Sequence, residues 1–183
     1  MPIDLRIETE GNPEEKRVEV MGTSSEFSVD TFGKPKSVEI DPGNKVLRLS
    51  PQMRVDVAIR KGEQFAQIGE YAEALQEYQR ALDTRKTSSM AHYRVGEVFF
   101  LQHNYQSAVN EFREALNGDN NPKWIEVWSH IYMGKIFDIT GQRERAVNEY
   151  TLAQRTRDNT QNAQDEIEKY LHTPYSEKSK ELV

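Results

Sequence analysis

Few residues of this 183-residue chain could bind a metal or carry out redox chemistry, and their spacing does not bring them together. The histidines are His92, His103, His130 and His172, and cysteine is absent. No two histidines are four residues apart, the spacing that places two ligands on one face of a helix. The sequence therefore predicts no metal site and no cofactor, and His92 and His130 are interpreted as half-buried structural residues.

Pairs of carboxylates are the other candidates for chemistry. Glu73 with Glu77, and Glu111 with Glu114, have spacings that could place an acid and a base side by side on a helix. Both pairs are expected on the outer face of a helix, so we interpret them as solvated. The chain has neither a glycine-rich phosphate loop nor a Ser-His-Asp grouping. The sequence thus predicts a chain with no catalytic residues.

Composition limits the partners. The chain has 24 Lys and Arg against 30 Asp and Glu, a net charge of -6, and neither half is basic. A nucleic-acid partner is therefore not expected. No apolar run reaches the length of about 20 residues that spans a bilayer, so membrane insertion is not expected either. The opening MPIDLRIETEG alternates apolar and charged residues, unlike a signal peptide, which favours a cytoplasmic protein or a piece of a longer one and leaves the compartment open.

The hydrophobic pattern changes near Pro51. Residues 1–50 alternate with a period of two, which predicts a small antiparallel β module of four or five strands. Its apolar pairs include Leu5 with Ile7, Val18 with Val20, Phe27 with Val29, Val38 with Ile40, and Leu47 with Leu49. The segment Asp41-Pro42-Gly43-Asn44 has the residues of a type II turn.

A repeat with a helical period follows Pro51. Each of Gly62, Gly96 and Gly134 is followed by Phe after three residues, Ala after twelve, Tyr or Phe after sixteen and Ala after nineteen. The glycines are 34 and 38 residues apart. Small residues that alternate with large ones allow paired helices to pack closely. The expected first helices are 54–68, 89–102 and 123–139, and the expected second helices are 72–84, 106–117 and 143–156.

These residues resemble the tetratricopeptide repeat family over residues 55–160, although Ala58, His92 and His130 replace its Trp and Lys61 replaces its first Leu. The resemblance implies a mainly α fold. Three helix pairs and a capping helix would form a solenoid over residues 52–171, with the β module of residues 1–50 before it. Residues 172–183 are expected to be a frayed polar tail.

Residues 1–50 also resemble the last β-sandwich strands of aminopeptidase N-type zinc aminopeptidases, through the hairpin from Val38 to Leu47. This resemblance implies that the chain is the C-terminal part of a larger peptidase-like protein. The HExxH helix of such enzymes is absent from these 183 residues.

The helix positions that face the concave side of such a solenoid are the candidate site for a protein or peptide segment. The candidate residues are Arg60, Glu63, Tyr93, Arg94, Glu97, Phe100, Trp128, Tyr132 and Lys135. Their aromatic and basic character predicts a partner with aromatic and acidic residues. Members of the family that clamp the terminal carboxylate of chaperone tails use Lys, Asn and Arg at positions that are here Ile59, Glu63, Arg94, Trp128 and Tyr132, so the clamp is absent.

An alternative reading of the aromatic residues is that the capping helix, the β module or a second copy covers them. Two functions follow. The first is a non-catalytic module that binds a partner segment in the concave groove. The second is a structural or dimerisation appendage of a zinc aminopeptidase-like enzyme, with no ligand of its own and with a homodimer as one of its forms.

Overall fold

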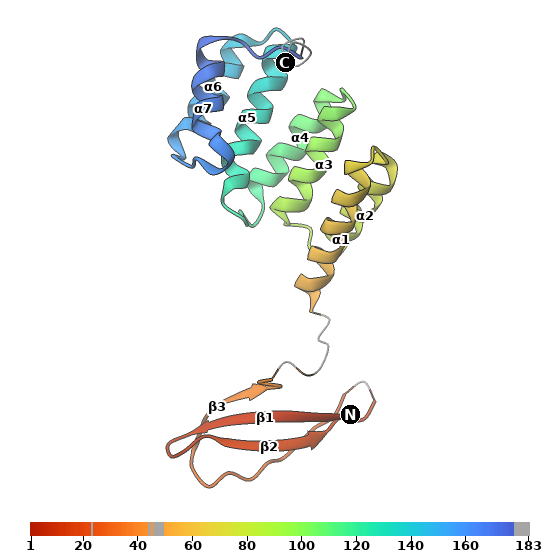
Figure 1. Cartoon of the computed structure of the whole chain (residues 1–183), viewed down its shortest axis with the longest axis vertical. Helices are drawn as coiled ribbons and strands as arrows, with labels where there is room; N and C mark the ends of the chain where they lie inside the picture. Colours follow the sequence, from red (N-terminus) through yellow and green to blue (C-terminus); the bar gives the residue numbers. More distant parts are fainter. Residues whose placement is uncertain (23, 44, 46–49, 178–183) are drawn as a thin grey trace. The chain divides into compact units, whose positions relative to one another are not determined.

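A computed structural model describes residues 1–22, 24–43, 45 and 50–177. The chain divides into two compact units, residues 1–49 and residues 50–183, and each is described by itself. The first unit holds the strands and the second holds the helices (Figure 1).

The first unit is an antiparallel sheet in the order β2-β1-β3, formed by β1 (Pro2–Thr9), β2 (Glu14–Glu19) and β3 (Pro35–Ile40). Leu5 and Ile7 of β1 lie opposite Ile40 and Val38 of β3, so all four apolar side chains share one face of the sheet. Leu5 and Ile7 are buried, whereas the two β3 residues remain more than half exposed. The sheet therefore has an apolar face that its own residues cover only in part.

The predicted number of strands is wrong for the described residues, which form three. Phe27 and Val29 are not in a strand, although both line a pocket of about 310 Å³ against the apolar face of the sheet. Leu47 and Leu49 lie outside the described residues. The prediction of a type II turn is also wrong. Such a turn requires a positive φ at Gly43, but the positive φ, 55°, occurs at Asp41 instead.

The second unit contains seven α-helices within its described residues (Figure 1). They are α1 (Pro51–Gln67), α2 (Tyr71–Thr84), α3 (Ser89–Leu101), α4 (Tyr105–Asn117), α5 (Trp124–Ile139), α6 (Arg143–Arg155) and α7 (Ala163–His172). Side-chain caps begin three of them, since Ser50, Ser88 and Asn104 each accept a hydrogen bond from the first turn of the helix that follows. The fold is a tetratricopeptide-repeat solenoid of three helix pairs with a seventh helix, as the sequence predicts.

The glycine and aromatic positions of the repeat meet inside each helix pair. Gly62, Gly96 and Gly134 lie against the rings of Tyr78, Phe112 and Tyr150, which are 1%, 0% and 0% exposed. A methyl group on Gly134 would lie 2.4 Å from Cε1 of Tyr150, closer than two carbon atoms can approach. Only a residue without a side chain allows the two helices of a pair to pack this closely.

One face of α1 is exposed as in an end repeat, and two of its three residues are polar. The residues at the corresponding positions of α3 and α5 pack against the preceding repeat. All of them are buried: Ala91, Val95 and Val98 on α3, and Ser129, Met133 and Ile136 on α5. On α1 the same positions are Val57, Lys61 and Gln64, and all three side chains are exposed. Terminal repeats of a solenoid need such a polar outer face.

Candidate functional site

Polar side chains link the first helices of successive repeats along the concave side. Arg94 of α3 forms an ion pair of 2.7 Å with Glu63 of α1. Arg94 lies two residues before the glycine of its repeat, and Glu63 lies one residue after the glycine of the preceding repeat. Tyr132 of α5 occupies the same position as Arg94 and donates a hydrogen bond to Glu97 of α3 at 3.3 Å. Arg94 also pairs with Glu97 of its own helix at 2.7 Å. We call this row the groove ladder.

A pocket of about 340 Å³ lies beside the groove ladder, and we call it the central pocket. Glu63, Arg94, Glu97 and Tyr132 form its polar side, and Leu101, which is 53% exposed, is one of its apolar residues. The other residues that line it are Ala66, Gln67, Tyr78 and Val98. A pocket that combines an accessible aliphatic surface with convergent polar groups is typical of a binding site.

The charges at the central pocket differ from the prediction of an acidic partner. Burial lowers the pKa of Arg94, but the nearby carboxylates of Glu97 and Glu63 outweigh it, and the pKa is raised above its usual range. Two carboxylates therefore surround one guanidinium. This pairing argues against Arg94 as the group that attracts an acidic partner, because its charge is already neutralised within the chain.

Two predicted aromatic anchors belong to the core. Tyr93 and Phe100 are 3% and 7% exposed, and their rings pack against Tyr132 at centroid distances of 6.0 and 5.1 Å. Trp128 is partly buried and donates a hydrogen bond from Nε1 to the carbonyl of Thr160 at 3.1 Å. Because rings from α3 and α5 fill the space between these helices, Tyr132 is the aromatic residue that borders the central pocket on the α5 side.

The end of the groove at the third repeat is covered by the chain itself. Lys135 is 8% exposed and its Nζ lies 2.8 Å from a carboxylate oxygen of Glu166 on α7. Four aromatic rings surround the same Nζ at 5.1 to 5.7 Å, those of Trp128, Tyr132, Tyr170 and Tyr175. At Lys135, therefore, the capping helix covers part of the groove, as the alternative interpretation in the sequence analysis proposes.

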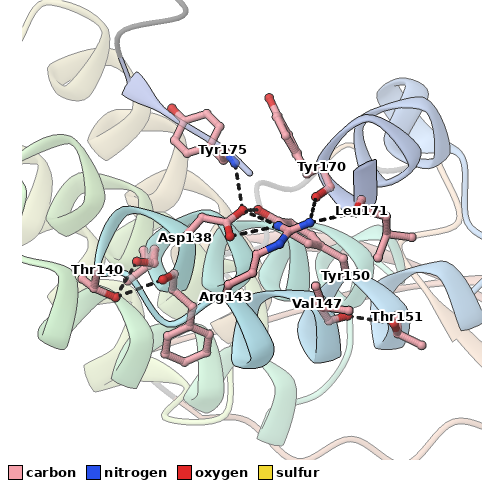
Figure 2. Close-up of polar contacts among 11 residues, drawn as sticks. Asp138, Thr140, Arg143, Val147, Tyr150, Thr151, Tyr170, Leu171 and Tyr175 are labelled. Carbon is pink, nitrogen blue, oxygen red and sulfur yellow. Dashed lines mark hydrogen bonds and ion pairs between the residues drawn. The ribbon is translucent and has the colours of Figure 1, made fainter. Parts of the chain in front are cut away.

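Asp138 ties the end of α7 and the residues after it to α5 (Figure 2). Its side chain has no exposed surface and accepts hydrogen bonds from Arg143 at 3.0 Å and from the backbone N–H of Tyr175 at 2.8 Å. Tyr150 donates a further bond at 3.0 Å. Arg143 in turn donates to the last carbonyls of α7, those of Tyr170 and Leu171. The prediction of a frayed tail is thus wrong for its first residues, since Tyr175 is 6% exposed.

One glutamate on each second helix pairs with a residue of the first helix of its repeat. Glu111 and Glu149, at equivalent repeat positions, accept from His92 and His130 at 2.8 and 2.7 Å. Glu77 holds the same position in the first repeat and pairs with Lys61 at 2.6 Å. Glu77 is 7% exposed, so its interpretation as a solvated residue is wrong.

Arg60 lies outside this network. It is exposed and lines a separate pocket of about 220 Å³ with Ile59 and Met90. Among the described residues, no three His, Asp or Glu side chains are grouped so that they could hold a metal ion. None of the helices in the described part of the chain is both long enough and apolar enough to cross a membrane.

Comparisons with known proteins agree with this fold. A family model described as TPR repeat matches residues 62–103. The chain is similar to the TPR2B domain of yeast Sti1, solved as a pHsp70 complex, with a TM-score of 0.58 and 13% identity over 66% of this chain and 94% of that one. It is also similar to the Arabidopsis OM64 TPR domain (TM-score 0.55, 16% identity, 67% and 98% covered) and to the N-terminal domain of STI-1 from C. elegans (0.54, 13%, 67% and 98%). No curated protein sequence matches the chain.

Three residues of the site, Glu166, Asp138 and Tyr175, were not among the predicted candidates. Glu166 lies one repeat length of 34 residues after Tyr132, so the repeat spacing could have identified it. Arg94, Tyr132 and Glu166 hold equivalent positions, and each contacts the first helix of the preceding repeat. Asp138 stands at a groove position, but nothing in the sequence indicates that its carboxylate is fully buried or that it pairs with Arg143 and Tyr175. Tyr175 follows Pro174 in a polar segment, and no periodicity marks it as buried.

Proposed function

We propose that the helical unit binds a segment of a partner protein in the central pocket. The observation that carries this proposal is the combination of an exposed aliphatic residue, Leu101, with the polar row of Glu63, Arg94 and Glu97 across two repeats. Rigid helices hold all of these groups, so little ordering is needed when a partner binds.

The pocket suggests the chemistry of the partner segment. An aliphatic side chain of the partner would be desolvated against Leu101 and Ala66. A donor such as an amide or a basic side chain would face Glu63 and Glu97, whose two charges exceed that of Arg94. The pHsp70 complex named for the yeast Sti1 domain supports a binding role for this fold, although the clamp residues implied by the family are absent here.

The alternative, an appendage of an aminopeptidase-like enzyme, has less support. It depends on the resemblance of residues 1–50 to β-sandwich strands. The match to the TPR repeat family covers residues 62–103 and does not include that segment. The exposed Val38 and Ile40 on the sheet are compatible with a further protein layer, but they do not identify one. We therefore place the interaction function first.

A pair of leucine variants tests the proposal. Leu101 at the central pocket and Leu152 on α6 are 53% and 42% exposed, so a change of either to Asp should leave the fold intact. The full chain and each variant would be used as bait in the source cell, with the amount of each captured protein measured. We expect Leu101→Asp to reduce capture of the specific partner at least about tenfold, because truncation of an interface anchor costs about 2 kcal/mol or more.

Leu152→Asp serves as the matched control and should capture the partner as the unaltered chain does. Circular dichroism must show the same helical content for all three proteins. Equal capture by the two variants would place binding outside the central pocket.

A further inference from the structure

Residues 173–177 follow α7, and two of them, Tyr175 and Glu177, contact helices of the preceding repeats. Thr173 follows α7 in an extended conformation with φ of -128° and ψ of 122°. The backbone N–H of Tyr175 then donates a hydrogen bond to the carboxylate of Asp138 on α5 (Figure 2). The segment thus contacts a first helix of the solenoid in the way that a separate peptide could.

The side chain of Tyr175 fills a site formed by α5 and α7. Its ring lies 5.3 Å from Nζ of Lys135 and packs edge-on against Tyr170 at a centroid distance of 5.3 Å. Burial is the main reason that the pKa of Tyr175 is raised above its usual range. An aromatic ring beside a cation in a desolvated site is the arrangement of a binding anchor.

The carboxylate of Glu177 reaches the second repeat. It accepts a hydrogen bond from the hydroxyl of Tyr105 at 2.9 Å and lies 3.3 Å from Nδ1 of His103. Burial, followed by the hydrogen bond and the charge of Glu177, raises the pKa of Tyr105 to about 12. Two side chains that are two residues apart therefore occupy two separate sites, one aromatic and one that accepts a carboxylate.

We propose that residues 173–177 are an internal ligand of the groove and that a partner segment with an aromatic residue, followed two positions later by Asp or Glu, exchanges with them. This proposal rests on the proposed function and extends it to a second subsite, next to the central pocket. The exposed Thr173 and Pro174 join the segment to α7, so it can leave the groove without unfolding α7. The aromatic and acidic chemistry predicted for the partner is thereby assigned to this subsite.

The internal segment makes the subsite less available to a partner. A tethered segment competes at an effective concentration on the order of 1 mM, so a peptide of the same sequence must displace it. Weakening the internal contacts in the full chain should free the subsite and raise the apparent affinity for the added peptide. A segment that is merely structural would leave no site that a peptide could enter.

The test uses a fluorescein-labelled, amidated peptide Thr-Pro-Tyr-Ser-Glu and the full chain. Its fluorescence anisotropy would be measured against the unaltered chain and against the Tyr175→Ala and Glu177→Gln variants. We expect the peptide to bind Tyr175→Ala about tenfold or more tightly than the unaltered chain, with a smaller gain for Glu177→Gln. The Thr173→Ala variant, altered at an exposed side chain of the same segment, should bind as the unaltered chain does.

Two altered peptides define the chemistry. Replacement of Tyr by Ala, or of Glu by Gln, should weaken binding to the Tyr175→Ala chain at least about fivefold. Circular dichroism checks the fold, and Glu177→Gln keeps the test decisive if Tyr175→Ala is unstable, because Glu177 is only partly buried. Equal binding by all the chains, or binding by none, would overturn the proposal. The Leu101→Asp result would still decide separately whether the central pocket binds a partner.

Discussion

Lys135 of α5 and Glu166 of α7 form an ion pair of 2.8 Å that repeats the register of the ion pair between Glu63 and Arg94. Burial opposes ionisation of Glu166, but hydrogen bonds from Lys135 and Tyr170 and the positive charges of Lys135 and Lys169 outweigh it, so the pKa of Glu166 is lowered below its usual value. The capping helix therefore joins the groove ladder as the first helix of a fourth repeat would. The ion pair between Lys135 and Glu166 thus helps α7 to cap the solenoid, and it also places α7 over part of the groove.

The first prediction concerns the repeat glycines. In a Gly96→Ala variant the new methyl group would lie 2.8 Å from Cε1 of Phe112, a rigid ring with no exposed surface. We expect a loss of about 1–2 kcal/mol in the free energy of unfolding, because overpacking outweighs the better helix propensity of alanine. Urea denaturation measures the change.

A second substitution provides the control for this packing effect. Phe112→Leu makes room at the same place and destabilises the chain by itself, but it should remove most of the penalty of Gly96→Ala in the double variant. Simple addition of the two losses would show that the glycine is required for another reason.

The second prediction concerns the groove ladder. Glu97 accepts from Arg94 and from Tyr132, so Glu97→Ala leaves both donors without this partner. We expect the free energy of unfolding to fall by about 2 kcal/mol, the usual cost of losing hydrogen bonds to a charged group. Glu73→Ala on the exposed face of α2 is the control and should change stability by less than about 0.5 kcal/mol. Similar losses for the two variants would argue against a structural role for the ladder.

The third prediction concerns the fully buried carboxylate of Asp138. Asp138→Ala removes the acceptor for Arg143, Tyr150 and the backbone of Tyr175. Loss of one member of a buried charge pair costs about 3–5 kcal/mol, and we expect a loss of this size in urea denaturation. Asp165→Ala, at an exposed position of α7, should be nearly neutral. A neutral result at Asp138 would mean that its hydrogen bonds contribute little to stability and that the other contacts of α7 hold it in place.

The helices were predictable from the sequence because packing requires small and large residues at fixed intervals. Gly134 and Tyr150 meet as their spacing indicates. The strands were less predictable, since the alternation at Phe27 and Val29 also suits a segment that lies on a sheet without pairing to it. A strand needs a partner at the right register, and local sequence does not contain that information.

The candidate site was predictable in its position but not in its chemistry. Concave positions follow from helical periodicity, and the central pocket contains Glu63, Arg94, Glu97 and Tyr132 from the predicted set. Which charges remain available depends on contacts between repeats. Arg94 and Lys135 are both neutralised by glutamates from neighbouring helices, so composition alone overestimates the positive charge of the groove.

The last prediction concerns the dependence of stability on pH at the pair of His92 and Glu111. Burial lowers the pKa of His92, but its hydrogen bonds to Glu111 and to the carbonyl of Lys86, with the charge of Glu111, outweigh burial, and the pKa is raised above 6.5. The folded chain therefore holds this proton more tightly than the unfolded chain does. The stabilisation is complete below about pH 6.5 and is lost as the pH rises through the folded pKa.

The measurement compares the unaltered chain with His92→Gln by urea denaturation from about pH 5 to about pH 8. We expect the difference in the free energy of unfolding to be largest at the acidic end and to shrink toward the alkaline end. His172→Gln, which changes an exposed histidine at the end of α7, is the control and should show a much smaller difference at every pH. A difference that grows with pH would mean that His92 is held in its neutral form, with burial rather than Glu111 as the dominant influence on its proton.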